Sequence, residues 1–282
     1  MKVGLALAGG GVKGASHIGV IKALQENGIE VDYVGGTSIG SIVASLFAMG
    51  YTTEEMLKLF KYFSKTIMKA DPKYYWTNVK TTKNFMGYGV LSGENIEIAI
   101  NECAELKGFK KVDDIKMPIV MPTVDIKNSR KYVFTNHEFD ENFDENTYIR
   151  DITIGKAVRA SCSYPGIFSL VRMRNLILAD GGIRENVPWR ILKESNCNTV
   201  FSIIFKENPS AKECNNILDV LTTSFDLICH ELSNYELNGA DYLINIQTPH
   251  VSLLDCSKIE ELYILGYRQT KEFINKNRLA FN

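Results

Sequence analysis

Two glycine-rich segments near the N-terminus carry residues that can do chemistry. In the first, Gly9, Gly10 and Gly11 directly follow a short apolar run, with Lys13 and Gly14 close behind. Glycines between a strand and a helix permit a sharp turn and expose consecutive backbone N–H groups to an anion. Because that anion is either a pyrophosphate or a transient oxyanion, the segment is compatible with dinucleotide binding and with hydrolysis. A tight turn that binds nothing is a third interpretation.

Ser38 is the centre of the second segment, Gly36-Thr37-Ser38-Ile39-Gly40. The pattern G-x-S-x-G between a strand and a helix is typical of a nucleophile elbow, where small flanking residues permit a strained turn that exposes the serine hydroxyl. The helix beginning at Ile39 adds its positive end, which favours developing negative charge. A dinucleotide-binding fold has no use for this elbow. In addition, Asp32, the candidate ribose-binding acid, precedes the apolar part of its strand instead of following it.

Asp180 is the candidate base for this serine. It stands in Asp180-Gly181-Gly182, directly after the apolar run 176–179. Serine hydrolysis usually needs a histidine, and none of the four histidines has a recognisable triad context; these are His17, His137, His230 and His250. His17 is expected to pack behind the glycine loop. An aspartate at a strand end can accept the serine proton, although the same motif is also compatible with a plain turn.

The elements that must position these residues alternate between strand and helix. Short apolar runs predict strands at 3–8, 33–35, 118–126, 130–135, 168–172, 176–179, 199–205 and 242–246. Helical spacing predicts helices at 16–27, 39–49, 54–68, 93–106, 154–160, 216–238 and 257–276. Thr53 and Ser92 are the predicted caps of the third and fourth helices. This alternation indicates an α/β fold with a mainly parallel central sheet and helices on both faces.

Composition narrows the class of protein. The chain has 282 residues, 45% of them hydrophobic and 23% charged, with a net charge of −1. Near-neutral charge argues against a nucleic-acid binder and leaves only a local basic patch open. The six cysteines show no C-x-x-C spacing, which indicates free thiols in a reducing compartment and no metal site. The first apolar run is too short for a signal peptide and no run spans a membrane, so we expect a cytoplasmic location.

As a set, the three motifs resemble those of the patatin-like phospholipase family. That family combines a glycine-rich oxyanion loop, a G-x-S-x-G elbow and a D-G-[GA] motif in this order. The stretch 160–168 resembles the family's A-S-x-x-x-P-x-x-F pattern, and 14–20 resembles its first helix. Ala8 is a departure, because plant members have an aspartate there. The resemblance is dense over 3–50 and 154–190 and thin elsewhere.

The resemblance implies a three-layer patatin-like fold in one domain over residues 1–282, with a variable lid-like excursion at about 54–92. It implies a Ser–Asp dyad with Ser38 as nucleophile and Asp180 as general base, and no cofactor or metal. It also implies the oxyanion donors Gly9, Gly10 and Gly11, supported by Lys13, Gly14, Gly36, Gly40, Gly181 and Gly182. The expected substrate is a fatty-acyl ester of a (phospho)lipid, with a peripheral location at a membrane as one option.

Several alternatives remain open. The same serine serves an acyltransferase equally well, and a regulatory member of the fold needs no catalysis. A dinucleotide-binding oxidoreductase is the remaining class. The aromatic and lysine-rich segment 58–76 is either a lid or membrane-facing surface or a simple closure of the core.

Overall fold

A computed structural model describes residues 1–67, 89–139, 146–207, 217–251 and 255–277. The strands are β1 (Val3–Leu7), β2 (Tyr33–Gly36), β3 (Gly89–Leu91), β4 (Ile119–Asp125), β5 (Arg130–Thr135), β6 (Asn146–Ile149), β7 (Gly166–Phe168), β8 (Val171–Met173), β9 (Leu176–Asp180), β10 (Thr199–Glu207) and β11 (Tyr242–Thr248). The helices are α1 (Ala15–Glu26), α2 (Ile39–Ala48), α3 (Thr53–Ile67), α5 (Glu94–Leu106), α6 (Ile154–Ser161), α7 (Trp189–Glu194), α8 (Ile217–Glu236) and α9 (Ile259–Lys276).

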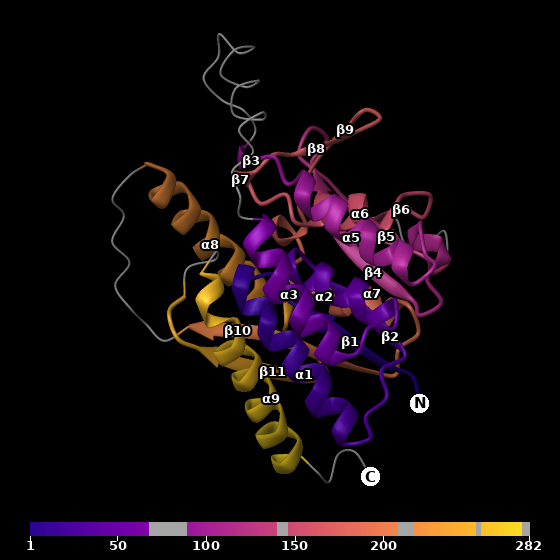
Figure 1. Ribbon diagram of the computed structural model, residues 1–282, viewed down its shortest axis with the longest axis vertical. Coiled ribbons are helices and arrows are strands. Elements are labelled where there is room, and N and C mark those ends of the chain that lie inside the picture. The colour runs from indigo at the N-terminus through magenta and orange to yellow at the C-terminus, as the bar shows by residue number, and fades with distance from the viewer. Residues whose placement is uncertain (68–88, 140–145, 208–216, 252–254, 278–282) are drawn as a thin grey trace.

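The central sheet has the strand order β11-β10-β1-β2-β4-β5-β6, and the hairpin β8–β9 joins it through β4. The pairs from β11 to β4 are parallel, as is β5 with β6. Only β4–β5, β4–β9 and β8–β9 are antiparallel among the described strands of this sheet. The prediction of a mainly parallel sheet is confirmed, and Figure 1 shows β1, β2 and β4 running through the middle of the molecule.

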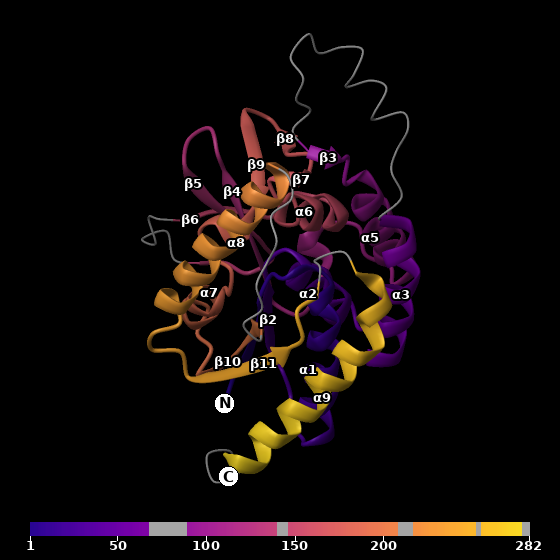
Figure 2. The same cartoon turned by 90° about the vertical axis from the view of Figure 1, so that its left-hand side faces the viewer.

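Helices cover both faces of this sheet, as predicted. Figure 2 shows α1, α2, α3 and α9 together on one side and α7 with α8 on the other. The helices α1 and α9 pack so closely that a Cβ added at Gly19 would lie 2.1 Å from the Tyr263 carbonyl oxygen. Helices on both faces hide both sides of the sheet from water, which explains why its central strands are apolar throughout.

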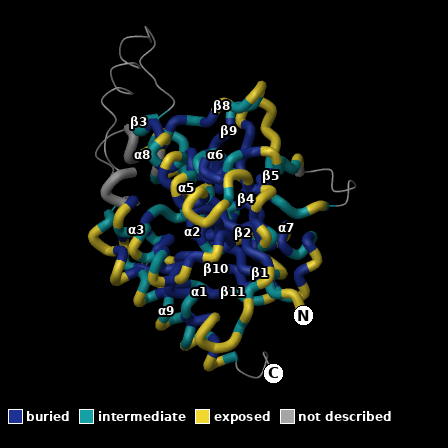
Figure 3. The backbone as a smooth tube through the Cα atoms, turned by 45° about the vertical axis from the view of Figure 1, so that its right-hand side comes forward, coloured by how far each residue is buried: buried dark blue, intermediate teal, exposed yellow. Residues whose placement is uncertain are grey.

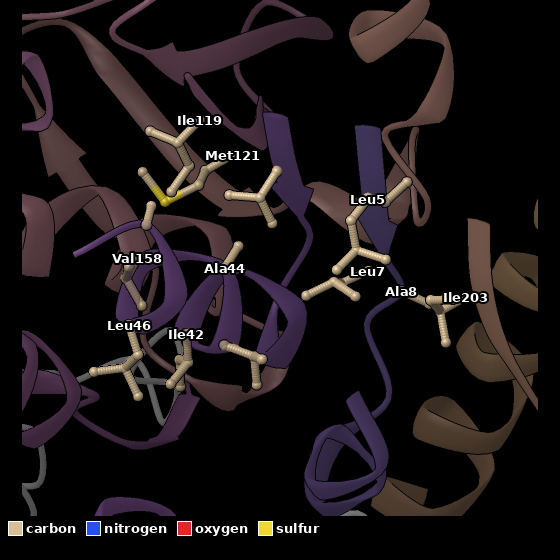
Figure 4. Packing of buried hydrophobic residues seen from close by; sticks show 14 of the residues in the cluster. Leu5, Leu7, Ala8, Ile42, Ala44, Leu46, Ile119, Met121, Val158 and Ile203 are labelled. Carbon is tan, nitrogen blue, oxygen red and sulfur yellow. The ribbon is translucent and has the colours of Figure 1, made fainter. Parts of the chain in front are cut away.

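The core is one contiguous cluster in which the first strand and the elbow helix take part. Figure 3 shows the buried positions concentrated along β1, β2 and the adjoining helices. Ala44 and Leu46 of α2 face Val158 of α6 and the start of β4 (Figure 4). Leu5 and Leu7 are fully buried. The segments that flank the glycine loop and the elbow are therefore held rigidly by close packing.

Two predicted helix caps are wrong by one residue. Thr52, not Thr53, caps α3: its hydroxyl accepts the Glu55 N–H at 3.2 Å, and the Glu55 carboxylate accepts the Thr52 N–H at 2.8 Å. This reciprocal pair is a capping box. Gly93 rather than Ser92 precedes α5, with φ of 74°, although the Ser92 hydroxyl still accepts the Glu94 N–H at 3.3 Å.

The predicted strand at 168–172 is also wrong. Phe168 ends β7, which pairs with β3 in a separate two-stranded sheet. The hairpin partner of β9 is β8, which begins at Val171, and the turn between the two strands falls at Arg174, with φ of 52°. The strand β6 and the short helix α7 were not predicted. Of the lid-like excursion at 54–92, the structure describes α3 and β3, whereas 68–88 lie outside the described residues.

Candidate active site

The site forms where two strands meet end to end along one edge of β4. Strand β5 occupies the opposite edge of β4. On the edge in question, β2 pairs in parallel with the start of β4, where Gly35 lies opposite Val120. The strand β9 pairs antiparallel with the end of β4, where Asp180 lies opposite Thr123. Because β2 and β9 run toward each other, their C-terminal ends meet, and each end carries one candidate catalytic residue.

Ser38 lies two residues beyond β2 and directly before α2. Its φ of 53° and ψ of −125° are strained for a residue with a side chain. The turn is tight enough that a Cβ on Gly36 would lie 2.1 Å from the Gly40 carbonyl oxygen, and one on Gly40 would lie 2.3 Å from the Leu7 carbonyl oxygen. Both flanking positions therefore require glycine, which is the geometry that the G-x-S-x-G pattern predicts.

Neighbouring hydroxyl groups hold the strained turn in place. The Ser38 N–H donates to Ser161 Oγ at 3.1 Å, and Ser41 Oγ donates to the Ser38 carbonyl at 2.6 Å. The Cys162 thiol lies 3.7 Å from Ser41 Oγ. Burial raises the pKa of this thiol, and the charge of Asp180 adds to the effect. Cys162 is therefore protonated at neutral pH and does not act as a nucleophile.

Asp180 is buried, with 2% of its surface exposed. Its Oδ1 accepts the Gly182 N–H at 2.8 Å, and its own N–H donates to the Ser163 carbonyl at 3.0 Å. Its Oδ2 accepts no hydrogen bond from the described residues. Burial raises the pKa of the carboxyl to about 6, while the nearby Ser38 hydroxyl and the Gly182 N–H lower it. A pKa close to neutrality suits a general base.

The D-G-G turn fixes the direction of this carboxylate. A Cβ on Gly181 would lie 2.4 Å from the Pro122 carbonyl oxygen, so the turn packs directly against β4. Gly182 leaves its N–H free to bind Asp180, and a Cβ there would lie 3.1 Å from Asp180 Oδ1. Both glycines of the motif thus lie in the turn that the D-G-G pattern predicts.

The glycine loop lies directly beside the nucleophile. The position of a Cβ on Gly9 is 3.2 Å from the Ser38 Cβ. However, the Gly9 N–H is already used, because it donates to Asn186 Oδ1 at 3.0 Å. The N–H groups of Gly10 and Gly11 begin a 3-10 turn and have no acceptor among the residues that the structure covers. Of the three predicted donors, these two remain available for an oxyanion.

Asn186 is a site residue that was not predicted from the sequence. Its side-chain oxygen lies 2.7 Å from the Cβ position of Gly9 and 3.3 Å from that of Gly182. Its backbone oxygen also accepts the Gly9 N–H, at 3.3 Å. Asn186 therefore joins the glycine loop to the turn that carries Asp180. Its place in that turn, a few residues after the aspartate, was the only sequence signal.

Lys13 and Gly14 support the loop through contacts with β10 and α2. The Lys13 ammonium pairs with Glu207 at 2.6 Å, and Glu207 also contacts His250 Nδ1 at 3.1 Å. A Cβ on Gly14 would lie 2.3 Å from the Ile39 side chain. The loop and the first residue of α2 thus pack in contact, which fixes the loop relative to the elbow.

The histidines whose side chains the structure describes bond elsewhere. His17 is fully buried and its Nε2 lies 2.9 Å from the Ala8 carbonyl. Burial lowers its pKa to about 4, so it is neutral and packs behind the loop as expected. His137 stacks edge-on against Tyr33. The His230 side chain lies outside the described part.

Two further expectations from the sequence concern metals and membranes. Within the described ranges, no three metal-ligating side chains come together. Of the helices that the structure describes, none is long and apolar enough to cross a membrane.

Comparisons with known proteins agree with this geometry. Residues 5–193 match the family model described as patatin-like phospholipase. Among curated proteins, the chain is 26% identical to Lysophospholipase NTE1 of Lodderomyces elongisporus and 28% identical to that of Scheffersomyces stipitis, in each case over 94% of its own length. It spans only 18% and 17% of those two proteins.

Solved structures show the same fold. VipD from Legionella pneumophila matches 98% of the chain with a TM-score of 0.53 at 14% identity, and the match covers 67% of VipD. The type III effector ExoU matches 99% of the chain with a TM-score of 0.50 at 15% identity, over 53% of its own length.

Proposed function

This chain belongs to the patatin-like phospholipase family, and we propose that it is a serine acyl hydrolase that cleaves fatty-acyl ester bonds of lipids. One observation carries the proposal. The ends of β2 and β9 meet on β4, so that Ser38 and the buried Asp180 lie together beside two N–H groups of the glycine loop that have no acceptor within the described ranges. A nucleophile, a base and an oxyanion site are the parts that acyl transfer needs.

In the acylation step, Ser38 Oγ attacks the ester carbonyl and its proton passes to Asp180. The N–H groups of Gly10 and Gly11 and the positive end of α2 stabilise the resulting oxyanion. The tetrahedral intermediate then collapses, the bond to the alcohol breaks, and Asp180 returns the proton to the departing alkoxide. The products of this step are an acyl-enzyme and a free alcohol.

In the deacylation step, a water molecule attacks the acyl-enzyme while Asp180 accepts one of its protons. Collapse of the second intermediate breaks the Ser38–acyl bond, and Asp180 gives the proton back to the serine. The fatty acid leaves and the enzyme is restored. If an alcohol replaces the water, the same chemistry is acyl transfer.

The raised pKa of Asp180 supports its role as the base. A free carboxylate has a pKa of ~3.9 and is a weak base near pH 7. Burial moves the pKa of Asp180 to about 6. Its Oδ2, which accepts no hydrogen bond from the described residues, remains available for the serine proton. Each oxyanion donor contributes about 3–4 kcal/mol to the stabilisation of the transition state in comparable sites.

The phospholipid part of the proposal rests on the relatives. Two of them carry the name lysophospholipase, and this chain spans less than a fifth of each. We therefore include a lysophospholipid or phospholipid as the physiological substrate, with an acyl ester as the bond that is cleaved. A cytoplasmic location belongs to the same proposal.

The test is labelling with a fluorophosphonate probe, followed by a hydrolysis screen over monoacyl and diacyl lipids. Ser38→Ala is expected to abolish labelling and to lower ester hydrolysis about a thousandfold or more. The matched control is Ser45→Ala, because this buried serine lies two turns further along α2 and its hydroxyl donates to the Ile42 carbonyl at 2.9 Å. Labelling of Ser38→Ala at the wild-type rate would show that Ser38 is not the nucleophile. Product analysis with added lysolipid separates hydrolysis from acyl transfer.

A further inference from the structure

The helix α8 presents an unusually apolar outer surface. Eleven large hydrophobic side chains are exposed among the described residues, and five of them lie on α8. Their exposed fractions run from 44% to 80%, and the residues are Val220, Leu221, Leu227, Ile228 and Tyr235. Their spacings of one, six, seven and eight residues place them on one side of an α-helix. We call this set the outer face of α8.

The opposite side of the helix binds the body of the protein. The Phe225 ring contacts the Tyr164 ring edge-on, with centroids 5.0 Å apart. At the C-terminal end, Trp189 Nε1 donates to the Glu236 carbonyl at 3.0 Å, and Leu237 just beyond the helix is buried. The middle and the C-terminal end of α8 are therefore held against the protein, and Figure 2 shows the helix on the outside of the molecule.

The anchored side places α8 next to the catalytic residues. Tyr164 directly follows Ser163, whose carbonyl accepts the Asp180 N–H at 3.0 Å. Figure 2 shows α8 extending between α7 and β7. The anchored side of α8 is therefore linked to Asp180 through Tyr164 and Ser163.

We propose that the outer face of α8 docks the enzyme on the surface of a lipid membrane and so brings the dyad to its substrate. This proposal rests on the proposed function, because a lipid ester is concentrated in such a surface.

The size of the face favours a membrane over a second copy of the chain. The five residues expose roughly 600 Å² of total surface, below the roughly 800 Å² of total surface that each partner buries in a standard stable interface. A patch of this size is at the upper end of the largest apolar patch on a typical monomer, and such patches often have a function. A membrane has no fixed shape to match, so that a narrow apolar stripe is sufficient.

The charge of the helix indicates which membrane. The sequence 217–236 contains no lysine or arginine, while Glu231 is exposed on the outer face. Attraction to anionic lipids requires basic side chains near the surface. Docking through α8 is therefore driven by apolar burial, and it should proceed on zwitterionic lipid and depend little on salt.

The experiment compares two double variants in flotation with phosphatidylcholine vesicles. Leu227→Gln with Ile228→Gln removes the centre of the outer face. Ile98→Gln with Ile264→Gln is the matched control, because these side chains are 54% and 52% exposed on α5 and α9. We expect the first variant to bind vesicles about tenfold or more weakly, since two large apolar side chains no longer enter the lipid. The control variant should bind as the wild type does.

Catalytic readouts separate docking from the chemistry. The α8 variant should hydrolyse a soluble short-chain ester at the wild-type rate and vesicle phospholipid about tenfold more slowly. Ser38→Ala should bind vesicles normally, so a failure of the proposed chemistry leaves the binding result interpretable. Wild-type vesicle binding by the α8 variant would overturn the proposal. So would a wild-type dimer that the variant dissociates while vesicle binding stays unchanged.

Discussion

The substitution Asp180→Asn, which replaces the buried carboxylate with a neutral side chain of the same shape, should stabilise the fold and abolish activity. Asp180 has a pKa of about 6 in the folded protein, against its ordinary value of 3.8, because burial penalises the charged form. At pH 8 the carboxylate is ionised in both states, and the difference of the two pKa values costs the folded state about 3 kcal/mol. Asp180→Asn keeps the acceptor for the Gly182 N–H and carries no charge. The variant should therefore be about 3 kcal/mol more stable at pH 8.

The stability difference between the wild type and Asp180→Asn should depend on pH. A carboxyl whose pKa is raised by folding binds more protons in the folded state over the range from about 4 to about 6. Its contribution to stability is fully present below pH 4 and is lost as the pH rises through 6. The stability of the wild type and of Asp180→Asn should therefore coincide near pH 4 and separate by pH 7.

The assay is thermal or urea unfolding of both proteins between pH 4 and pH 8. For a chain of this size, 3 kcal/mol corresponds to a Tm difference of roughly 6 °C at pH 8. Asp125→Asn serves as a control whose stability should change in the opposite direction. Asp125 lies on β4, the strand that pairs with β9. Burial raises the pKa of Asp125, but hydrogen bonds from Ile177, Asn128 and Lys127 outweigh it and lower the pKa overall. Its charged form stabilises the fold, so the control variant should lose stability at neutral pH.

Parallel stability curves for the wild type and Asp180→Asn would refute the reasoning. Such a result would mean that the carboxylate is solvated or paired in the folded protein, and the argument for its basicity would fail. Retention of ester hydrolysis by Asp180→Asn would remove Asp180 from the mechanism directly.

The same site gives three shorter predictions. The value of kcat/KM should rise with pH and level off above about 6, because only ionised Asp180 accepts the serine proton; a pH–rate profile with no inflection near 6 would contradict this role. Asn186→Ala should lower kcat about tenfold or more with little change in KM, since the glycine loop loses the acceptor of the Gly9 N–H; steady-state kinetics on a soluble ester measures both. Gly40→Ala should destabilise the fold more than Gly28→Ala in thermal unfolding, because a Cβ at 40 lies 2.3 Å from a backbone oxygen, whereas one at 28 meets open space and adds only the strain of a φ of 72°; a loss at 40 no larger than the loss at 28 would contradict the close contact at the elbow.

Local sequence patterns account for much of the site. The elbow around Ser38 is a five-residue turn, and its glycines follow from close approaches between residues near each other in the chain or on the adjoining strand. Most strands and helices lie where apolar periodicity predicts them. The capping errors at Thr53 and Ser92 are of one residue, since neighbouring hydroxyl groups compete for the same N–H donors.

The sequence could not show which backbone N–H groups of the glycine loop already donate to another residue. The three consecutive glycines look equivalent, but the Gly9 N–H is taken by Asn186 from a segment far away in the chain. The same holds for α8, whose apolar residues resemble core residues in the sequence. Only the packing of Phe225 against Tyr164 decides which side is buried and which is exposed.

The sequence by itself determined that Ser38 sits in a strained turn, because backbone sterics within a few residues impose that conformation. It indicated Asp180 only through the resemblance of the three motifs to a family. The tertiary structure decided the partnership, because β9 runs antiparallel to β4 on the edge that β2 leaves free. Strand register over that distance depends on packing of the whole sheet, which no local pattern encodes. Burial of the carboxylate, and with it the raised pKa, is a consequence of the same packing.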